Sequence, residues 1–516
     1  MPQHAVDDQS EVLGFLGGSS AYGTGEAIKR IDTHGASVFL TGRDAYKVKR
    51  SVRFPFMDFS TLEKRRLACE REIEVNRANA PDIYLGVVPI ARGPSGLAIG
   101  GVGDVVEWAV HMRRFDENAT LDQVAKRDGV TPNLAEEIAS VVAAAHERAP
   151  RMDFDSAGAM ERILAENAEG LSEYPELASE AETRRLTGLS QRLLGQVRGL
   201  LAARQHAGCV RRCHGDLHTR NIAMRDGKPF LFDALEFDEK LATCDMLYDL
   251  AFLIMDLWAG GHPQAANATL NGYLNLSGEE QVTGLAAFPL FLSARAAIRA
   301  KVTAAAADSL DGDRRAQAFQ EARGYFDLAM RCLMPIPPRL VAVGGLSGTG
   351  KSTLAARIAP RIGAIPGAVL ARSDVERKRL FGVPSTRRLG ASAYSEEVTV
   401  EVYAGMRRMA DLALAAGRGC LADAVHAKLE ERDAIEAAAR ARGVSFDGLW
   451  LDAPLEARLE RVKTRVNDAS DATPDIARGQ AGLDVGAMSW RRIDATGDAQ
   501  LIEKRALDAL GLKPDG

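Results

Sequence analysis

The stretch that decides the fold of the C-terminal third is Gly345-Leu346-Ser347-Gly348-Thr349-Gly350-Lys351-Ser352-Thr353. It is a complete Walker A loop, in which successive backbone N–H groups wrap a phosphate and only glycine permits so close an approach. We expect this run to cradle the phosphates, with Lys351 on the β- and γ-phosphates and Ser352 on Mg²⁺. An apolar strand over 339–343 and a helix from Lys351 are expected around it, which is the context that the motif requires.

A second phosphate-handling segment lies upstream, at His214-Gly215-Asp216-Leu217-His218-Thr219-Arg220-Asn221, with Asp233 after a strand-length gap. Phosphoryl transfer needs a carboxylate near the acceptor hydroxyl and oxygen ligands for the magnesium ions that bridge the phosphates. The spacing predicts Asp216 at the acceptor, with Asn221 and Asp233 as metal ligands. Each of the two segments therefore implies ATP and Mg²⁺.

The upstream segment also admits a zinc interpretation. Cys209, Cys213, His214 and His218 offer four ligands. Their spacing is unusual for a structural zinc site, and the phosphotransfer motif already accounts for His214. We therefore expect the phosphotransfer interpretation to hold.

The H-G-D-x-x-x-x-N segment with its later aspartate resembles the aminoglycoside phosphotransferase family, over residues 25–330. Gly215 stands where protein kinases of the H-R-D type have arginine, which favours the branch that phosphorylates small molecules. The resemblance implies an α+β, protein-kinase-like bilobal domain, with a small lobe over 1–112 and a helical lobe over 113–333. Asp249 is expected to be structural. Glu236, Asp238 and Glu239 are suggestive of an acidic acceptor pocket, with solvated loop carboxylates as the alternative.

The same resemblance implies a lysine on a small-lobe strand, paired with a glutamate on the following helix. Lys47 is the expected phosphate-binding lysine, but Lys49 shares its strand face by the period of two, so both stay open. Glu72, on a helix expected over 61–79, is the expected partner. The competing acidic residues on that helix are Glu70 and Glu74.

Downstream of the Walker A loop, Arg372-Ser373-Asp374-Val375-Glu376-Arg377 resembles the R-x-D-x-x-R segment of P-loop small-molecule kinases and of polynucleotide kinase. The resemblance implies that Asp374 is the base at the acceptor hydroxyl and that Arg377 positions the acceptor. Asp423, at the end of an apolar strand, is expected near the magnesium. Arg461 and Arg465 are expected to act as lid arginines on the transferred phosphate, with surface ion pairs as the alternative.

Composition and charge limit the classes of protein to which this chain can belong. The 516 residues carry a net charge of -5 and 46% hydrophobic residues, so a general attraction to nucleic acid is not expected. The six cysteines are scattered, the acidic N-terminus lacks a signal pattern, and no apolar run of about 18 residues occurs. We expect a cytoplasmic protein without a membrane segment. Residues 334–338 are a proline-rich linker, and residues 339–516 are expected to form an α/β P-loop domain with a parallel sheet.

The whole arrangement resembles a family of bacterial fusion proteins that join an aminoglycoside-phosphotransferase-like half to an AAA-type P-loop kinase half. It predicts two ATP-dependent sites that phosphorylate hydroxyls of small molecules such as sugars, amino sugars or aminoglycosides. Two alternatives stay open. One half is an ATP-binding sensor, or the P-loop half is a polynucleotide 5′-end kinase, although only 6% aromatic residues disfavour single-strand stacking.

Overall fold

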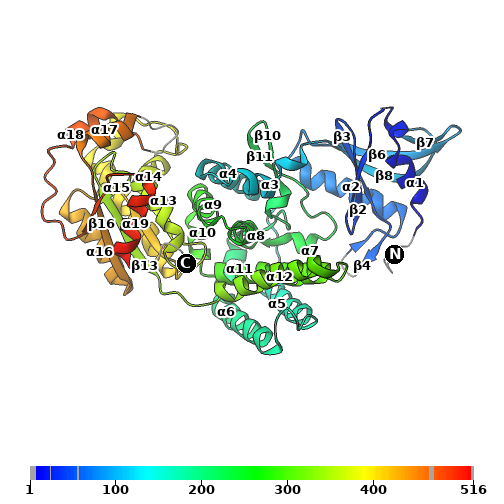
Figure 1. The fold of residues 1–516 in the computed structure, drawn as a ribbon. Coiled ribbons are helices and arrows are strands. Elements are labelled where there is room, and N and C mark those ends of the chain that lie inside the picture. The colour runs from blue at the N-terminus through cyan, green and yellow to red at the C-terminus, as the bar shows by residue number, and fades with distance from the viewer. Residues whose placement is uncertain (1–6, 24, 55–56, 464–469, 513–516) are drawn as a thin grey trace. The chain divides into compact units, whose positions relative to one another are not determined.

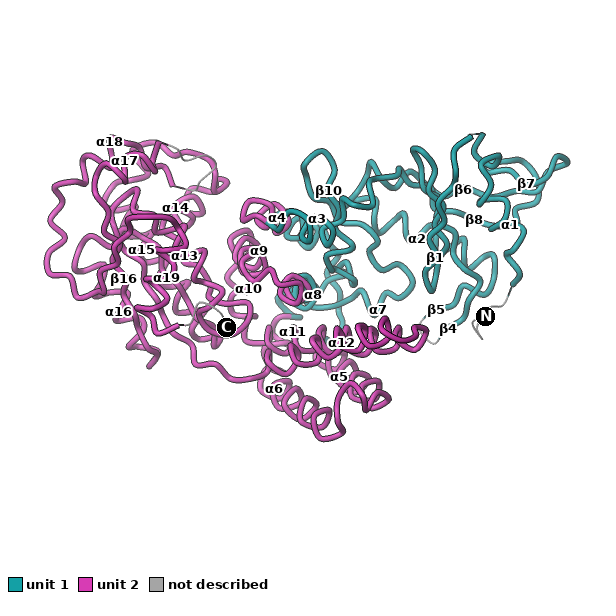
Figure 2. The backbone as a smooth tube through the Cα atoms, viewed as in Figure 1, with its two compact units in different colours: residues 1–130, 140–156, 205–253 teal, residues 131–139, 157–204, 254–516 magenta. Residues whose placement is uncertain are grey.

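The computed structural model describes residues 7–23, 25–54, 57–463 and 470–512. The chain forms two compact units (Figure 2). Unit 1 comprises Met1–Val130, Ser140–Ser156 and Gln205–Leu253, and unit 2 comprises Thr131–Ala139, Ala157–Arg204 and Ile254–Gly516. The helical segments 157–204 and 254–333, which precede the linker, therefore belong to the same unit as the Walker A loop.

Unit 1 begins with the helix α1 (Ser10–Gly17) and a six-stranded antiparallel sheet (Figure 1). Alternating apolar residues and turn residues predict strands over 37–40, 45–48, 84–90, 97–99 and 105–112, and all five are present. In spatial order they are β1 (Lys29–Asp32), β2 (Ala36–Leu40), β3 (Asp44–Lys49), β8 (Asp104–Arg113), β6 (Tyr84–Gly93) and β7 (Gly96–Ile99). The short strands β4 (Arg53–Phe54) and β5 (Met57–Asp58) pair beside this sheet as a separate ladder.

Helix α2 packs against this sheet. It was expected over 61–79 and runs over Leu62–Arg77, with the Thr61 side chain accepting a hydrogen bond from the Lys64 N–H at its start. The buried Cys69 contacts Tyr84 and Val110 of the sheet in a small apolar cluster. This packing fixes the face of α2 that points toward strand β3.

The remainder of unit 1 is helical around a few short strands. The antiparallel hairpin of β10 (Ile222–Arg225) and β11 (Lys228–Leu231) follows the upstream motif, and β9 (Val210–Arg212) pairs with β12 (Thr243–Asp245). The helices here are α3 (Leu121–Asp128), α4 (Pro132–Arg148), α7 (Glu239–Ala242) and α8 (Met246–Ala259), of which α4 and α8 continue into unit 2. The expected pattern, helices interrupted by a catalytic segment, is confirmed.

Unit 2 contains the other helices that precede the linker. They are α5 (Ser156–Ser172), α6 (Glu180–His206), α9 (Pro263–Leu276), α10 (Glu279–Gly284), α11 (Phe288–Ala307) and α12 (Gly312–Cys332). The expected linker follows α12 without helix or strand and leads into β13 (Arg339–Gly345).

Two asparagines of α9 bond the backbone around the start of strand β14 (Val369–Arg372). Asn267 Nδ2 donates to the carbonyls of Pro366 at 3.1 Å and Ala368 at 3.0 Å. The Leu370 N–H donates to Asn271 Oδ1 at 2.7 Å, and Asn271 Nδ2 donates to Ala368 O at 3.2 Å. Both asparagines are buried, so these groups satisfy one another away from solvent. We call this set of hydrogen bonds the asparagine clamp.

The P-loop half is a five-stranded, fully parallel sheet with strand order β14-β15-β13-β16-β17. The strands expected over 339–343 and before Asp423 are β13 and β15 (Cys420–Asp423), and the apolar run 449–451 likewise predicts β16 (Ser445–Asp452). Strands β14 and β17 (Arg491–Asp494) were not expected. The helices of this half are α13 (Lys351–Ile358), α14 (Ser373–Leu380), α15 (Glu396–Ala415), α16 (Leu429–Arg442), α17 (Leu455–Lys463), α18 (Pro474–Gly479) and α19 (Ala499–Leu510).

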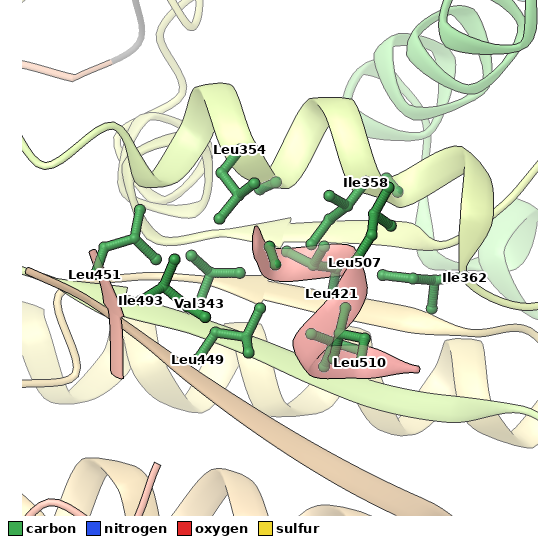
Figure 3. Close-up of a cluster of buried hydrophobic side chains, with 14 of the residues drawn as sticks. Val343, Leu354, Ile358, Ile362, Leu421, Leu449, Leu451, Ile493, Leu507 and Leu510 are labelled. Carbon is green, nitrogen blue, oxygen red and sulfur yellow. The ribbon is translucent and has the colours of Figure 1, made fainter. Parts of the chain in front are cut away.

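One face of this sheet is covered by α13 and α19. Figure 3 shows Val343 and Leu449 of the sheet packed with Leu354 of α13 and Leu507 of α19. All four side chains are at most 2% exposed, so burial of apolar surface holds the Walker A helix on the strand that precedes the loop. Among the described residues, no helix is long and apolar enough to cross a membrane.

Candidate functional sites

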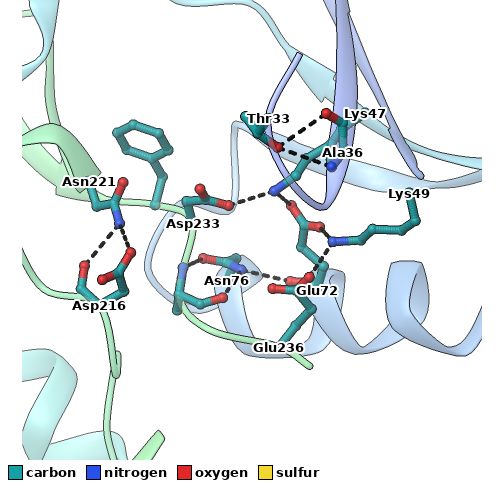
Figure 4. A network of polar contacts seen from close by, with 12 residues as sticks. Thr33, Ala36, Lys47, Lys49, Glu72, Asn76, Asp216, Asn221, Asp233 and Glu236 are labelled. Carbon is teal, nitrogen blue, oxygen red and sulfur yellow. Dashed lines mark hydrogen bonds and ion pairs between the residues drawn. The ribbon is translucent and has the colours of Figure 1, made fainter. Parts of the chain in front are cut away.

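In unit 1, strand β3 directs two lysines at one glutamate of α2 (Figure 4). Lys47 Nζ lies 2.9 Å from Glu72 Oε1 and 2.6 Å from Asp233 Oδ1. Lys49 Nζ lies 2.5 Å from Glu72 Oε2 and also pairs with Glu236. The expected ion pair of Lys47 with Glu72 is thus present. Lys47 also pairs with Asp233, the aspartate that was expected to bind metal.

Burial and charge act in opposite directions on this network. Burial lowers the pKa of Lys47, but the carboxylates of Asp233 and Glu72 outweigh it and hold that pKa well above its ordinary value. Burial raises the pKa of Asp233, and the ammonium of Lys47 more than offsets it, so this pKa lies below its ordinary value. Lys47 and Asp233 are both ionised at neutral pH, as phosphate and metal binding require.

The backbone at Asp233 is held in an uncommon conformation. Its φ is 59°, in the left-handed region that residues other than glycine seldom adopt. The Asp233 N–H donates to the hydroxyl of the buried Tyr84 at 2.9 Å. The Asn76 side chain of α2 accepts from the Ala234 N–H at 2.7 Å and donates to the Ala234 carbonyl at 3.3 Å. These bonds attach the segment that carries Asp233 to the same helix that carries Glu72.

Asp216 and Asn221 lie together on the loop that precedes β10. Asn221 Nδ2 donates to the backbone oxygen of Asp216 at 2.9 Å and to its Oδ2 at 3.0 Å. Asp216 is close enough to Asp233 for its charge to oppose the lowering of the Asp233 pKa. The three motif residues Asp216, Asn221 and Asp233 therefore gather at one place. Lys47, which lies 186 residues before Asp233 in the sequence, joins them through its ion pair with Asp233.

Asp249 holds the catalytic segment from behind. Its carboxylate accepts hydrogen bonds from the backbone N–H groups of His214 at 3.2 Å and Gly215 at 2.9 Å. It also lies 3.1 Å from His146 Nε2 and is completely buried. Gly215 has a φ of 83°. Asp249 thus has the structural role expected of it, and glycine suits the turn that it holds.

The acidic residues after Asp233 take other roles than lining an acceptor pocket. Glu236 is only 7% exposed and pairs with Lys49. Asp238 caps α7 by accepting from the N–H groups of Lys240 and Leu241. The suggestion of an acidic acceptor pocket therefore has no support at these two positions.

Two of the four zinc candidates, His214 and Cys213, are also engaged otherwise. His214 Nε2 lies 3.0 Å from the Phe232 carbonyl, and Cys213 Sγ lies 3.7 Å from the Cys244 carbonyl. Among the described residues, one group could hold a metal by proximity, and it consists of His146, Cys213 and Asp249. A hydrogen bond to Cys244 and burial raise the pKa of Cys213 well above its ordinary value, so its thiol keeps the proton. The hydrogen bond between His146 and Asp249, and that from Cys213 to the Cys244 carbonyl, account for this group.

In unit 2, two glycines of the Walker A loop stand where any side chain would collide. Gly345 has a φ of 140°, and an added Cβ would lie 2.8 Å from the Leu451 carbonyl oxygen. At Gly348, with a φ of 87°, an added Cβ would lie 2.5 Å from the carbonyl oxygen of Arg458. Gly350 is the left-handed N-cap of α13. The loop therefore has the strand–loop–helix geometry that was expected, in which backbone N–H groups of such loops bind anions.

A cavity of about 340 Å³ opens beside this loop. Its walls include Lys351 and Ser352, Asp374 at the start of α14, and Asp423 at the end of β15. The carboxyl ends of parallel strands meet at one edge of a sheet, which brings these side chains together from distant parts of the chain. Ser347, Gly348 and Arg377 also line it. The residues fit a magnesium nucleotide, since a lysine, a hydroxyl and two carboxylates converge on one space.

Asp374 has the environment of a proton acceptor. Burial, and then the neighbouring Asp423, raise its pKa above the ordinary value, against the opposing charges of Arg372 and Lys351. Arg372 Nε lies 3.4 Å from Asp423 Oδ2. A carboxylate whose pKa is raised in a cleft is a candidate for general-base catalysis.

The expected arginines are placed differently from one another. Arg377 lies on the cavity wall, where its Nη1 donates to the Ala393 carbonyl at 2.6 Å. Arg461 does not line the cavity; its guanidinium donates to the carbonyls of Thr349 at 3.1 Å and Ala495 at 2.8 Å. Arg465 lies outside the described residues. Of the two expected arginines that the structure describes, Arg377 alone lines the cavity.

Several cavity residues carry no sequence motif. The Ser347 N–H donates to Gln480 Oε1 at 2.7 Å. Asp471 pairs with Lys378 at 2.5 Å and accepts from the Tyr394 hydroxyl at 2.6 Å. Asp471 comes six residues after Arg465, the second of the expected lid arginines, and this is the one signal in the sequence for it. Gln480 lies 133 residues from its partner and gives no signal.

Two families match the chain. The family described as "Phosphotransferase enzyme family" matches residues 45–285, and an "AAA domain" family matches residues 340–482. The first span contains the lysine network and the upstream motif. The second contains the Walker A loop and most of the 340 Å³ cavity wall.

Whole-length relatives are found in mycobacteria. Uncharacterized proteins of Mycobacterium tuberculosis strain H37Rv and of Mycobacterium bovis are each 30% identical over 476 residues, covering 90% of this chain and 92% of the relative. Among solved structures, choline kinase from Cryptosporidium parvum is 13% identical, with a TM-score of 0.38. The matched region covers 63% of this chain and 95% of the choline kinase chain. A gluconokinase from Sinorhizobium meliloti is 19% identical, with a TM-score of 0.25. The matched region covers 34% of this chain and 92% of the gluconokinase chain.

Proposed function

Because this chain belongs to the family of its mycobacterial relatives and joins a phosphotransferase-family domain to a C-terminal P-loop kinase domain, we propose that it has two ATP-dependent sites that phosphorylate small-molecule hydroxyls. The observation that carries the proposal is the convergence of Lys351, Asp374 and Asp423 on one cavity beside the Walker A loop. Unit 1 contributes a second, independent set of phosphotransfer residues.

At the P-loop site, the backbone N–H groups of the loop and Lys351 hold the β- and γ-phosphates. Ser352 and Asp423 would hold Mg²⁺, which offsets the charge of the phosphates when it is bound. Asp374 takes the proton from the acceptor hydroxyl as its oxygen bonds to the γ-phosphorus and the bond to the β-phosphate oxygen breaks. A positioned base of this kind contributes about 10²–10⁴-fold in rate. Arg377 positions the acceptor from the cavity wall.

At the unit 1 site, Lys47 is held by Glu72 for the phosphates, and Asn221 and Asp233 would hold the magnesium ions. Asp216 accepts the proton of the acceptor hydroxyl. Arg461, as a group beside the Walker A loop, and Arg465 remain proposals for stabilising the transferred phosphate.

The acceptor of the P-loop site is proposed to be a small polyol or amino sugar. The cavity of about 340 Å³ is of the size that small-molecule sites have, and its walls are rich in hydrogen-bonding side chains. These include Tyr394, Thr399, Tyr403 and Glu431. A 5′-end kinase would instead need an open, basic channel for a nucleic-acid strand.

The test is transfer of labelled γ-phosphate from ATP to a pool of sugars, amino sugars, aminoglycosides and nucleosides, read by mass spectrometry. Asp216→Asn should abolish the products of unit 1, and Lys351→Ala those of the P-loop site. Matched controls are Asp226→Asn, on an exposed hairpin turn, and Lys504→Ala, on the exposed face of α19. Products from only one of the two sites would favour the alternative in which the other half is an ATP-binding sensor. Phosphate appearing only on oligonucleotide 5′ ends would establish the end-kinase alternative.

A further inference from the structure

Unit 1 contains a second cavity, of about 190 Å³, behind the catalytic segment. Its walls come from the C-terminal half of α2, the C-terminal end of α4 and the residues around His214. Lys47, Asp216, Asn221 and Asp233 do not line it, so it is separate from the phosphotransfer residues.

Positive charge predominates on the walls of this cavity. Three arginines line it, against the two carboxylates of Glu74 and Asp249. Arg71 lies 2.7 Å from Glu74, and Asp249 is already engaged by the backbone of the catalytic segment and by His146. The other two arginines, Arg148 and Arg212, form no ion pair with a carboxylate of the described residues.

The contacts of these two arginines leave donor capacity. Arg148 is exposed and donates one hydrogen bond, from Nη2 to Asn79 Oδ1 at 2.9 Å. Arg212 donates to the carbonyls of Cys213 at 3.3 Å and Leu235, while its buried Nε has no hydrogen-bond partner. A buried guanidinium N–H without an acceptor is costly, and an oxyanion in the cavity would supply one.

His214 adds a requirement of the opposite kind. Its Nε2 lies 3.0 Å from the Phe232 carbonyl, which can only accept, so Nε2 carries the proton. Burial lowers the pKa of the ring, although Asp249 and Asp216 act in the opposite direction, so the ring is neutral. Nδ1 is then a bare acceptor, and it is buried without a partner in a residue that is 5% exposed. A ligand that satisfies this wall must also donate a hydrogen bond.

From these observations we propose that the cavity binds a small oxyanion that carries a hydroxyl group, such as hydrogen phosphate or a hydroxylated acid. Arg148 and Arg212 bind the anionic oxygens, and the hydroxyl donates to His214 Nδ1. Glu74 and Arg148 are exposed at the wall, which gives a small ion access from solvent.

The position of this anion site connects it to the phosphotransfer residues. Arg71 and Asn79 lie on or just after the helix that carries Glu72, and Ala234 of the wall follows Asp233 directly. A bound anion would join α2 to the catalytic segment through charge-assisted hydrogen bonds, and would thereby steady the pairing of Lys47 with Glu72 and Asp233. The binding itself does not depend on the proposed function.

The test uses the full chain with Lys351→Ala, which weakens phosphate binding at the Walker A loop. Inorganic phosphate and sulfate are titrated separately by calorimetry at matched ionic strength near neutral pH, where phosphate carries a P–OH group and sulfate has none. Phosphate is expected to bind at least tenfold more tightly than sulfate. It is also expected to slow amide hydrogen exchange in residues 71–79 and 212–217.

Added substitutions locate the bound ion. Arg148→Ala, at an exposed position that tolerates truncation, and Arg212→Lys should each weaken phosphate binding at least tenfold. Arg192→Ala, which removes the same charge from the exposed face of α6, should leave it unchanged. Equal binding of sulfate and phosphate, or phosphate binding that survives both arginine substitutions, would overturn the proposal.

Discussion

Lys49 Nζ lies 2.5 Å from Glu72 Oε2, while the other oxygen of the same carboxylate is taken by Lys47. The two lysines alternate along β3 and share a face, so their sequence positions do not distinguish them. The second ion-pair partner of each lysine distinguishes them, because Lys47 pairs with Asp233 and Lys49 pairs with Glu236. Lys49 is 1% exposed and Lys47 is 13% exposed. We therefore propose Lys47 as the lysine that binds the phosphates and Lys49 as a structural ion-pair partner.

The two lysines should respond differently to the same substitution. Lys47→Met leaves Glu72 paired and should abolish phosphotransfer by unit 1 with little loss of stability. Lys49→Met leaves Glu72 and Glu236 with one fewer buried cation and should cost about 3–5 kcal/mol of unfolding free energy. Urea unfolding and product formation, measured on both variants, check this. A Lys49→Met variant as stable as the parent, with activity lost, would reverse the assignment.

Activity of the P-loop site should fall with acidity at a higher pH than an ordinary aspartate would give. Asp374 must be deprotonated to accept the proton, and burial together with Asp423 raises its pKa above 3.8. Arg372 opposes this rise, so Arg372→Gln should move the acidic limb of kcat/KM further up the pH scale. An acidic limb that moves down, or that stays in place in this variant, would show that another group titrates.

The stability of unit 2 should decline between neutral pH and pH 3 because of His426. Burial, and then Lys351 and Arg432, lower the pKa of this histidine to about 3. Its unfolded pKa of about 6.5 is higher, so the unfolded chain binds the proton more readily and stability is lost as the pH falls below 6.5. The loss at pH 5 is about 2 kcal/mol, from 1.5 pKa units at about 1.36 kcal/mol each.

His426→Phe offers the comparison for this effect, since it keeps an aromatic ring and removes the titration. The His426 ring lies 5.1 Å from that of Trp490, so tryptophan fluorescence reports unfolding close to the site. Urea unfolding at pH 7 and pH 5 should show a smaller difference for the variant than for the parent. Equal differences would assign the acid sensitivity to other groups.

Removal of the Gln480 side chain should strengthen nucleotide binding at the Walker A loop. Gln480 accepts the Ser347 N–H, one of the groups expected to hold phosphate, so the nucleotide must displace it. A neutral hydrogen bond is worth about 1 kcal/mol, which gives roughly fivefold tighter binding in Gln480→Ala. Gln480→Glu should weaken binding, since its charge repels phosphate. Titration of fluorescent ADP in a Lys47→Met background measures the P-loop site alone, and weaker binding by Gln480→Ala would mean that Gln480 holds the nucleotide.

The parts predicted from the sequence are those that a local pattern dictates. The Walker A loop depends on glycine conformations within nine residues, and the expected strands of the small lobe follow from alternation and turns. The positions of Arg461 and Gln480 depend on how α17 and α18 pack on the loop, which involves contacts across more than 100 residues. No motif predicts His426, because its burial comes from Tyr403 and Trp490, each distant in the chain.

The asparagine clamp determines where the chain can be cut to give a stable C-terminal fragment. Strand β14 lies at the edge of its sheet, and an uncovered edge presents unpaired backbone groups to any passing strand. Asn267 and Asn271 occupy those groups around Leu370, and both belong to the segment before the proline linker. A fragment that begins at the linker would lose this cover and would tend to self-associate. The boundary of the stable C-terminal fragment therefore lies upstream of α9, within the half that carries the other motif.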